Sequence, residues 1–427
     1  MKRITKAFHK ITENPSPYFI YGMALSIPLS VSLGNIFIII SVLYSVFLLV
    51  KKKLRLQQFT RFSFVFPAAY FLIIVLSGLL SKDLDQGLRV IDKSSLFVLV
   101  SFSTIALYTS KHLLGKVLLV FSASTLFTTI ILILYGIFNI IFKEKPIETL
   151  LFHEFTRLFD QHPVYFALYI SFSIFSLTAL SNHSWLINKK PHVFASIIIL
   201  ICGLFLTASK AVIIGFTVLY VFQLKTVFKT KRLKIIAMLF LITSVITISS
   251  ISFLRNRFIE GVKFTSNFKP TNDLTKANIF DSENKYDISD LELRYILGSI
   301  GLYHLIKDKK ILFGYGVGDT QNHLDYYYMS YGLAPNWFEG LNLHNQYLEI
   351  IVSLGILTFL FFVSYIFYGF NMALTSENNL YVFYIILVLF AFLFESYFMR
   401  NKGIVFFIFL NTLFITHSLY ESCNIRN

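Results

Sequence analysis

Long apolar segments constrain the fold of this chain more than any other feature of its sequence. A helix that crosses a lipid bilayer needs about 20 mainly apolar residues, and segments of roughly that length recur along most of the 427 residues. Their positions are 18–50, 62–80, 94–110, 117–142, 163–182, 193–208, 211–224, 235–254, 343–368, 380–398 and 403–420. The pattern predicts an all-α integral membrane protein.

The first apolar segment is longer than one crossing requires. It covers 18–50 and is interrupted near its middle by Pro28 and by Gly34-Asn35. Because proline and glycine interrupt helices, we interpret this segment as a hairpin of two short helices. The expected number of transmembrane helices is then about 12.

The composition excludes several classes of protein. Only 14% of the residues are charged and 56% are hydrophobic, whereas about a quarter of the residues in a soluble domain are charged. A soluble enzyme and a disordered protein are therefore excluded. The two cysteines, Cys202 and Cys423, provide no disulfide framework.

The distribution of charge predicts an orientation in the membrane. With the N-terminus inside, the cytoplasmic tails and loops hold 19 basic and three acidic residues, and the outer side holds 19 basic and 18 acidic residues. Excess Lys and Arg in short loops marks the cytoplasmic side. The net charge of +15 thus indicates orientation, with both termini cytoplasmic, and gives no reason to expect a nucleic-acid partner.

Three regions follow from this topology. Residues 1–254 form an N-terminal transmembrane bundle of about nine helices, 255–342 form one large outer loop between the ninth and tenth spans, and 343–427 contain about three further helices. In the loop, Ser289-Asp290-Leu291-Glu292 has the pattern of a capping box. We expect an amphipathic helix at about 290–307, lying on the membrane surface.

Glycine and aromatic residues follow this helix. The segment Gly314-Tyr315-Gly316-Val317-Gly318 is a flexible turn that permits close backbone approach, and no Gly-Lys-Ser/Thr follows it, so it is not a Walker loop. Aromatic side chains in the next segment are interpreted as an interfacial belt rather than a sugar-stacking surface. They are Tyr326, Tyr327, Tyr328, Tyr331 and Trp337.

Several motifs between about 200 and 370 resemble the O-antigen ligase and polymerase superfamily. They are Thr207-Ala208-Ser209-Lys210, then Arg294 with Leu312-Phe313-Gly314-Tyr315-Gly316, then His344-Asn345-Gln346-Tyr347-Leu348-Glu349 with Leu354-Gly355-Ile356. The resemblance implies an enzyme of the bacterial inner membrane that takes glycans from undecaprenyl pyrophosphate on the periplasmic face. Ligases transfer the glycan to lipid A–core, and polymerases transfer it to another lipid-linked repeat. It also implies a metal-independent reaction without a cofactor.

The resemblance assigns roles to individual residues. His344 matches the general base, and Arg294 matches the loop arginine that contacts pyrophosphate. Lys210 stands where the family has a second arginine, so the charge is kept but the planar guanidinium fork is lost. Ser209 and Asn345 are further substrate-binding candidates, and Glu349 is a candidate for a supporting role around the site.

The chemistry of these residues suits glycosyl transfer from a lipid diphosphate. Histidine accepts protons near neutral pH because its unperturbed pKa is about 6.5. Ser209 and Lys210 begin the eighth span at its outer end, where free amides, the helix dipole and the ammonium group favour an anion. We therefore expect an inverting displacement in which His344 activates the acceptor and Arg294 and Lys210 hold the diphosphate.

Other polar residues have simpler interpretations. Glu349 lies five residues after His344, so on a straight helix the two do not share a face. Glu395 falls in the expected eleventh span, 380–398, and is expected to pair with Arg400. The outer residues Arg89, Arg157 and His162 are candidates to line the access route of a glycan, by position alone.

Alternatives remain open for each assignment. His344 is also explained as an interfacial histidine, Lys210 as a snorkelling side chain, and Arg294 as a solvated residue. Asp83-Leu84-Asp85 has the spacing of a metal-ligand pair, but no histidine or cysteine spacing supports a metal. At the level of function, the alternatives to a ligase are an O-antigen polymerase, a protein-glycosylating relative, and a transporter or lipid-carrier flippase of another class.

Overall fold

The computed structural model describes residues 14–54, 56–181, 189–227, 288–334 and 338–425, together with 259, 261, 263, 264, 267–272 and 280. Within these ranges all regular elements are helical, and seven helices are long and apolar enough to cross a membrane. They are Val31–Val50 (α3), Phe62–Leu79 (α4), Leu84–Leu107 (α5, Leu84–Ser94, and α6, Leu96–Leu107), Leu113–Lys143 (α7), Pro163–Leu180 (α9), Gln346–Thr375 (α16) and Asn401–Ser422 of α18 (Asn401–Ile425).

Among the described residues there are also three shorter apolar helices, Lys190–Leu206 (α10), Lys210–Gln223 of α11 (Lys210–Val227) and Asn379–Phe392 (α17). The short helix Ser16–Ser26 (α2) precedes α3. The all-helical membrane fold expected from the sequence is confirmed. The expected ninth span, 235–254, lies outside the described residues, so the number of about 12 spans stays a prediction.

The interruption in the first apolar segment is confirmed. Helix α2 ends at Ser26 and α3 begins at Val31, where the Ser30 side chain accepts a hydrogen bond from the Leu33 amide at 3.2 Å. The break therefore surrounds Pro28, whereas Gly34-Asn35 lies inside α3. The two helices pack against each other, as a hairpin requires.

Two expected boundaries are wrong. The outer connection expected at 81–93 is mostly helix α5, which a bend at Ser95 separates from α6. The apolar segment expected to span 380–398 stops being an α-helix at Phe392, and only a short turn, Tyr397–Met399, follows before α18. Hydropathy missed this end because the residues after Phe392 are still largely apolar.

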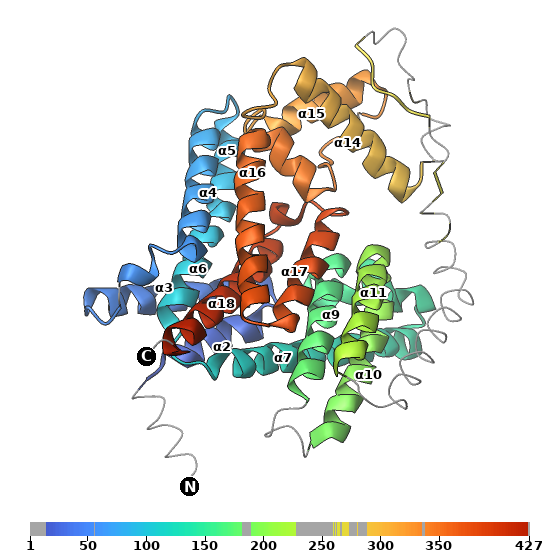
Figure 1. Ribbon diagram of the computed structural model, residues 1–427. Coiled ribbons are helices and arrows are strands. Elements are labelled where there is room, and N and C mark those ends of the chain that lie inside the picture. Colours follow the sequence, from blue (N-terminus) through green and yellow to red (C-terminus); the bar gives the residue numbers. More distant parts are fainter. Residues whose placement is uncertain are drawn as a thin grey trace.

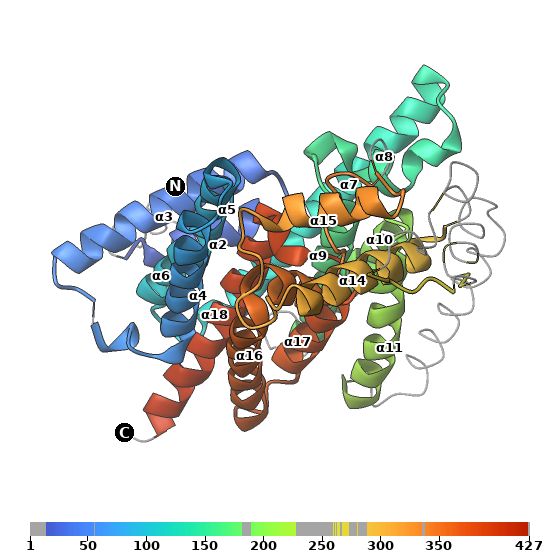
Figure 2. The ribbon, with the colours of Figure 1, turned by 90° about the horizontal axis from the view of Figure 1, so that it is seen from above.

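Figure 1 shows helices α14, Asp290–Lys307, and α15, Thr320–Ser330, at one end of the bundle, and Figure 2 shows both lying across that end. Helix α14 has the expected bounds and the complete capping box. The Ser289 side chain accepts from the Glu292 amide at 3.2 Å, and the Glu292 carboxylate accepts from the Ser289 amide at 3.0 Å.

A second hydrophobic core, separate from that of the bundle, lies beneath these two helices. Ile296, Leu297 and Ile300 of α14 are fully buried there. Tyr328 and Tyr331 are fully buried in the same core, and Tyr327 stacks on His304 with ring centroids 3.6 Å apart. Interpreting these three tyrosines as an interfacial belt is therefore wrong, because they pack against protein; Trp337 lies outside the described residues.

The glycine segment makes the close backbone approach that its sequence predicts. The amides of Tyr315 and Gly316 donate to the carbonyls of Val352 and Ser353 at 2.9 and 3.0 Å. Helix α16 is broken at Gly355, whose φ of 83° lies in the left-handed region. The freed carbonyls before the break thus bond to the segment that follows α14.

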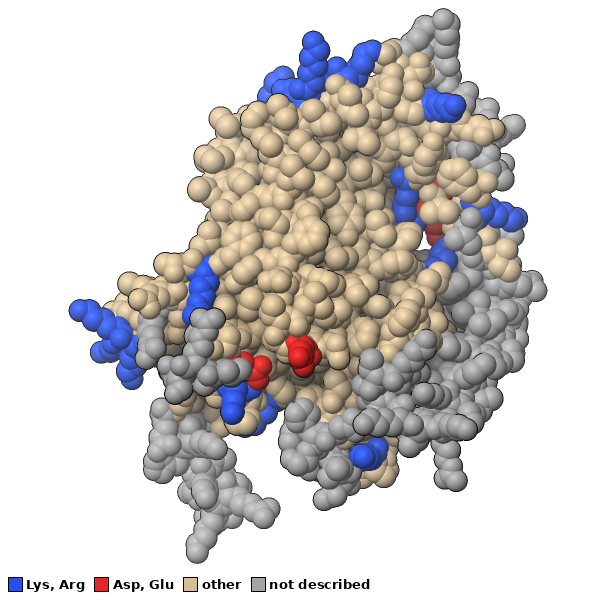
Figure 3. All heavy atoms as spheres, in the orientation of Figure 1, with Lys and Arg blue, Asp and Glu red and all other residues tan. Residues whose placement is uncertain are grey.

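The outer surface of the bundle is suited to lipid. Figure 3 shows charged groups near the two ends of the molecule and a broad belt without them on the visible face. Large apolar side chains on α3 are exposed, among them Ile39 at 56% and Leu43 at 64%. Exposed apolar surface of this extent is typical of helices that face acyl chains.

Candidate active site

The connection between α17 and α18, residues 393–400, is the meeting point of the predicted site residues. The Asn345 side-chain amide donates to the Leu393 carbonyl at 3.3 Å, and Arg294 Nε donates to the Phe394 carbonyl at 3.2 Å. Helices α14 and α16 are thereby joined to the same short connection. This connection was hidden in the expected eleventh span, so hydropathy alone could not reveal it.

His344 lies beside Glu395 of this connection. The His344 Nδ1 atom is 3.9 Å from Glu395 Oε2, which allows charge attraction but is too long for a hydrogen bond. The imidazole is one-quarter exposed, whereas the Glu395 side chain is only 8% exposed. A base that takes a proton from an acceptor would therefore have a buried carboxylate next to it.

Burial raises the pKa of the Glu395 carboxyl, but its interactions with His344, His162 and Arg400 outweigh this effect and hold the pKa below its usual range. The expected simple pair of Glu395 with Arg400 is thus incomplete, because the carboxylate is also close to His344. Burial lowers the pKa of His162 to about 4 despite the attraction of Glu395. His162 is therefore neutral at pH 7, beside an ionised carboxylate.

The two predicted cations meet at the start of α14. Lys210 Nζ is 2.6 Å from Asp290 Oδ2, and Arg294 Nη1 donates to the Asp290 carbonyl oxygen, also at 2.6 Å. Burial lowers the pKa of the Arg294 guanidinium, while the charge of Asp290 opposes this shift. Asp290 thus holds both cations in fixed positions, a role that sequence reasoning missed.

The helix that begins with Lys210 supports this arrangement. Ser209 is buried, and its carbonyl accepts from the Ile213 amide at 2.9 Å as the first turn of α11. Ala208 before it has a left-handed φ of 48°. The abrupt start places Lys210, at the N-terminal end of α11, next to Asp290.

Asn345 and Glu349 shape the backbone around His344. The Asn345 side-chain oxygen accepts from the amides of Tyr347 and Leu348 at 3.0 and 3.1 Å, which caps α16. Glu349 Oε2 accepts from the Leu343 amide at 3.3 Å and from Ser396 Oγ at 2.9 Å. The two residues thus fix the chain before His344 and after Glu395.

A cavity of about 440 Å³ adjoins the end of the 393–400 connection. It is lined by Val31, His153, Asp160, Gln161, His162, Tyr165, Met399, Arg400, Asn401 and Lys402. Of the three residues expected to line an access route, His162 lines this cavity. Arg89 is exposed on α5, and Arg157 pairs with Glu154 at 3.2 Å.

The aspartate pair considered as a metal motif has another role. Asp83 caps α5, because its side chain accepts from the Gln86 amide at 3.0 Å, and Asn322 donates to it at 3.2 Å. Its pKa is lowered first by the bond from the Gln86 amide. These contacts explain why Asp83 is ionised, because its carboxylate caps helix α5.

The fold and the site together define a multi-pass membrane protein with cationic groups and a histidine–carboxylate pair at one end of the bundle. Residues 195–363 match a family model described as O-antigen ligase. This match covers less than half of the chain and confirms the resemblance to the O-antigen ligase and polymerase superfamily, whose members are glycosyltransferase-like enzymes acting on lipid-linked glycans. No curated protein gives a significant match to the chain.

Proposed function

We propose that this protein is an O-antigen ligase that transfers a glycan from undecaprenyl pyrophosphate to lipid A–core. The proposal includes a place in the bacterial inner membrane, cytoplasmic termini and a periplasmic loop at 255–342. The observation that carries it is the gathering of His344, Arg294 and Lys210 around the 393–400 connection and Asp290. These residues come from distant parts of the sequence and would have no reason to meet if each were merely an interfacial side chain.

The reaction is a displacement at the anomeric carbon of the donor. His344 takes the proton of an acceptor hydroxyl, whose oxygen forms the new glycosidic bond. The bond to the diphosphate breaks with inversion, and the carrier diphosphate leaves with the electron pair. A general base of this kind contributes about 10²–10⁴-fold, and the Glu395 carboxylate stabilises the imidazolium that forms.

The leaving group needs fixed positive charge. Arg294 and Lys210 are held by Asp290 before substrate binds, so little reorganisation is needed when the diphosphate develops its charge. The amides at the start of α11 add to this field. The chemistry that we propose is metal-independent, as the family resemblance implies, because these cations take the part that a metal has in other transferases.

Deleting the gene and separating the envelope glycolipids on a gel tests the function. A ligase deletion leaves lipid A–core uncapped, with polymer accumulating on its carrier. Core bearing a single repeat would identify a polymerase instead. Unchanged glycolipids would contradict both.

Purified protein separates an enzyme from a transporter or flippase. We expect protein reconstituted with lipid-linked glycan and lipid A–core to form the linked product, and His344→Ala to abolish transfer while inserting normally into membranes. Retention of wild-type transfer in His344→Ala would remove His344 as the base.

A further inference from the structure

The cavity beside the catalytic centre has the character of an anion site. Arg400 and Lys402 contribute two cations to its wall, His153 and His162 contribute imidazoles, and Asp160 is the one carboxylate among the lining residues. Lys402 Nζ donates to the backbone carbonyl of Asp160 at 3.2 Å rather than to its carboxylate. The wall therefore carries net positive charge even with neutral histidines.

The backbone adds to this field. Helix α9 begins at Pro163 and α18 begins at Asn401, and residues at both starts line the cavity. The N-terminal ends of helices favour anions through their free amides and dipoles. Two such ends together with two cations favour a group with more than one negative charge, such as a phosphate or diphosphate ester.

Gln161 provides a separate sign that a polar ligand belongs here. Its side chain is only 4% exposed and its Nε2 atom donates to the Pro28 and Leu29 carbonyls at 2.9 and 2.8 Å. Its Oε1 atom is buried without a hydrogen-bond partner. A buried acceptor of this kind is destabilising when left unsatisfied, and a ligand hydroxyl in the cavity would satisfy it.

An apolar crevice adjoins the cavity. Its walls come mainly from α3 and α18 and share Val31, Asn401 and Lys402 with the cavity. Ile27, Gly34, Ile38 and Val405 also line it. Beyond the crevice, α3 exposes a row of large apolar side chains. Lys402 is the one charged residue among the described residues that line the crevice, and it is shared with the cavity, so an otherwise uncharged path leads from the cationic cavity toward the lipid-facing surface.

We propose that this cavity binds the phosphate-bearing head of a lipid substrate, with the lipid chain lying in the crevice between α3 and α18. The inference rests on the proposed function and deepens it. Arg294 bonds to the Phe394 carbonyl, and the charge of Arg400 acts on the Glu395 carboxylate. Cations from two different parts of the chain thus approach the His344–Glu395 pair, as suits a reaction between two phosphate-bearing lipids.

Two lipids share this chemistry, the polyprenyl diphosphate donor and a phosphorylated glycolipid acceptor. Full-length protein in nanodiscs would be titrated with undecaprenyl pyrophosphate and with lipid A by native mass spectrometry. For one of the two lipids, we expect the double variant Arg400→Ala/Lys402→Ala to bind about 10- to 100-fold more weakly, as expected for lost charge-assisted bonds. The lipid affected identifies the occupant.

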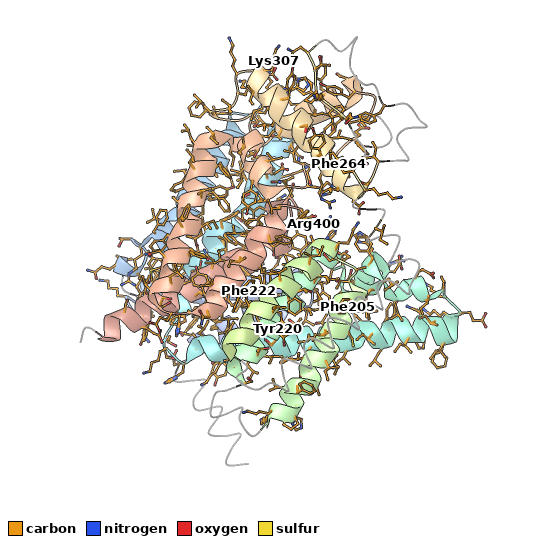
Figure 4. The ribbon with its side chains drawn as sticks, turned by 45° about the vertical axis from the view of Figure 1, so that its right-hand side comes forward. Phe205, Tyr220, Phe222, Phe264, Lys307 and Arg400 are labelled. Carbon is orange, nitrogen blue, oxygen red and sulfur yellow. The ribbon has the colours of Figure 1, made fainter. Side chains whose placement is uncertain are left out.

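Conservative and distant variants separate a lost site from a damaged fold. Arg400→Lys/Lys402→Arg keeps both charges and should restore most of the affinity. Lys307→Ala removes a cation from the far end of α14, well away from Arg400 in Figure 4, and should bind both lipids normally. A folded double alanine variant that binds both lipids with wild-type affinity would overturn the proposal.

The crevice has its own test. The side of Gly34 is open, with Ser26 Oγ 4.0 Å from the place of an added Cβ, so Gly34→Leu can fold and fill the crevice. It should weaken the long-chain lipid about tenfold or more and leave inorganic pyrophosphate binding at the same site unchanged. Equal weakening of both probes, or of neither, would contradict a chain in the crevice.

The outcome separates this inference from the proposed function because binding is measured without turnover. His344→Ala should lose transfer and keep lipid binding. Lipid binding that depends on Arg400 and Lys402 in a protein that transfers no glycan would retain the inference and reject the proposed reaction. Transfer that depends on His344 but not on the cavity cations would reject the inference alone.

Discussion

At the scale of single residues, His344 is held in a costly conformation. Its φ of 47° lies in the left-handed region directly before the residue that caps α16, and the Asn342 side chain accepts from its amide at 3.0 Å. A non-glycine residue in this region costs about 1–3 kcal/mol and persists where the surroundings determine it. The bonds of Asn342, Asn345 and Glu349 provide that determination, so the imidazole is positioned before substrate arrives.

The first prediction concerns Glu395. We expect Glu395→Gln to lower kcat by about tenfold, which is less than the 10²–10⁴-fold contribution of the general base itself, with little change in donor affinity. The neutral amide cannot stabilise the imidazolium that forms when His344 takes the proton. Steady-state transfer assays over a series of donor concentrations measure kcat and KM separately.

Glu154→Gln is the matched control for this prediction. Glu154 is a half-exposed carboxylate at the same end of the bundle, paired with Arg157, and its loss should leave kcat unchanged. An unaltered kcat in Glu395→Gln would show that the carboxylate has no role in the proton transfer.

The second prediction concerns Lys210. Lys210→Arg should keep or raise transfer activity, because a guanidinium can grip a phosphate through two donors while still reaching Asp290. Lys210→Met should raise the KM for the donor about tenfold or more, since it removes the charge and leaves Asp290 without this partner. Donor titrations on membranes with matched protein content give the measurement, and complete inactivity of Lys210→Arg would count against a diphosphate site.

At the scale of the elements, Gly355 decides how α16 meets the loop after α14. A Cβ there would collide with the Leu312 carbonyl, and the φ of 83° disfavours side chains as well. Gly355→Ala should therefore lower the apparent Tm strongly and displace the segment that bonds to Val352 and Ser353. Thermal unfolding in detergent measures this.

A variant at Gly340 separates the effect of the steric collision from the effect of the left-handed backbone conformation. It has a similar φ of 77° but open space where a Cβ would lie, so Gly340→Ala pays only about 1–2 kcal/mol for its left-handed backbone. Similar melting shifts for the two variants would show that the close contact at Gly355 contributes little.

Local sequence patterns predicted where elements begin and end better than they predicted the contacts between elements. The capping box fixed the start of α14 because its partners are three residues apart, and Pro28 broke the first segment because its effect is local. The end of α17 was missed because the chain there is apolar, yet its carbonyls bond to Asn345 and Arg294. Tyr328 is buried by α14, which no local pattern can show.

Local sequence patterns also failed to show which residues meet at the candidate site. His344, Arg294 and Lys210 were recognised through family motifs, and the structure brings each of them to the 393–400 connection or to Asp290. Asp290 belongs only to the capping box, and Arg400 and Lys402 belong to no motif. The importance of all three depends on which distant side chains they approach. The one available signal is that Arg400 and Lys402 are basic residues at the start of the last apolar segment.

At the scale of the whole molecule, two hydrophobic cores are stacked on each other. The larger core holds the bundle, and the smaller one holds α14, α15 and the N-terminal end of α16. The candidate site lies where the two cores meet, with Arg294 from the smaller unit reaching Phe394 of the bundle. Loosening the smaller unit should therefore impair transfer before the bundle itself unfolds.

Acid provides a way to loosen the smaller unit selectively. Burial lowers the pKa of His304 to about 4, and it also lowers the pKa of His323. An unfolded histidine titrates near 6.5, so between pH 6.5 and 4 the unfolded state binds more protons than the folded state. Stability contributed by these neutral histidines is thus lost as the pH falls through this window.

We expect the apparent Tm in detergent to fall between pH 7 and pH 5, and transfer activity to fall with it. In His304→Gln the glutamine amide can still bond to the Tyr331 hydroxyl, which lies 3.0 Å from His304 Nε2, but cannot take up the proton. This variant should show a shallower dependence of Tm on pH, whereas His192→Gln, at an exposed position on α10, should follow the wild type. If His304→Gln instead loses stability with acid as steeply as the wild type, His304 does not set the response, and His323 or groups in the bundle do.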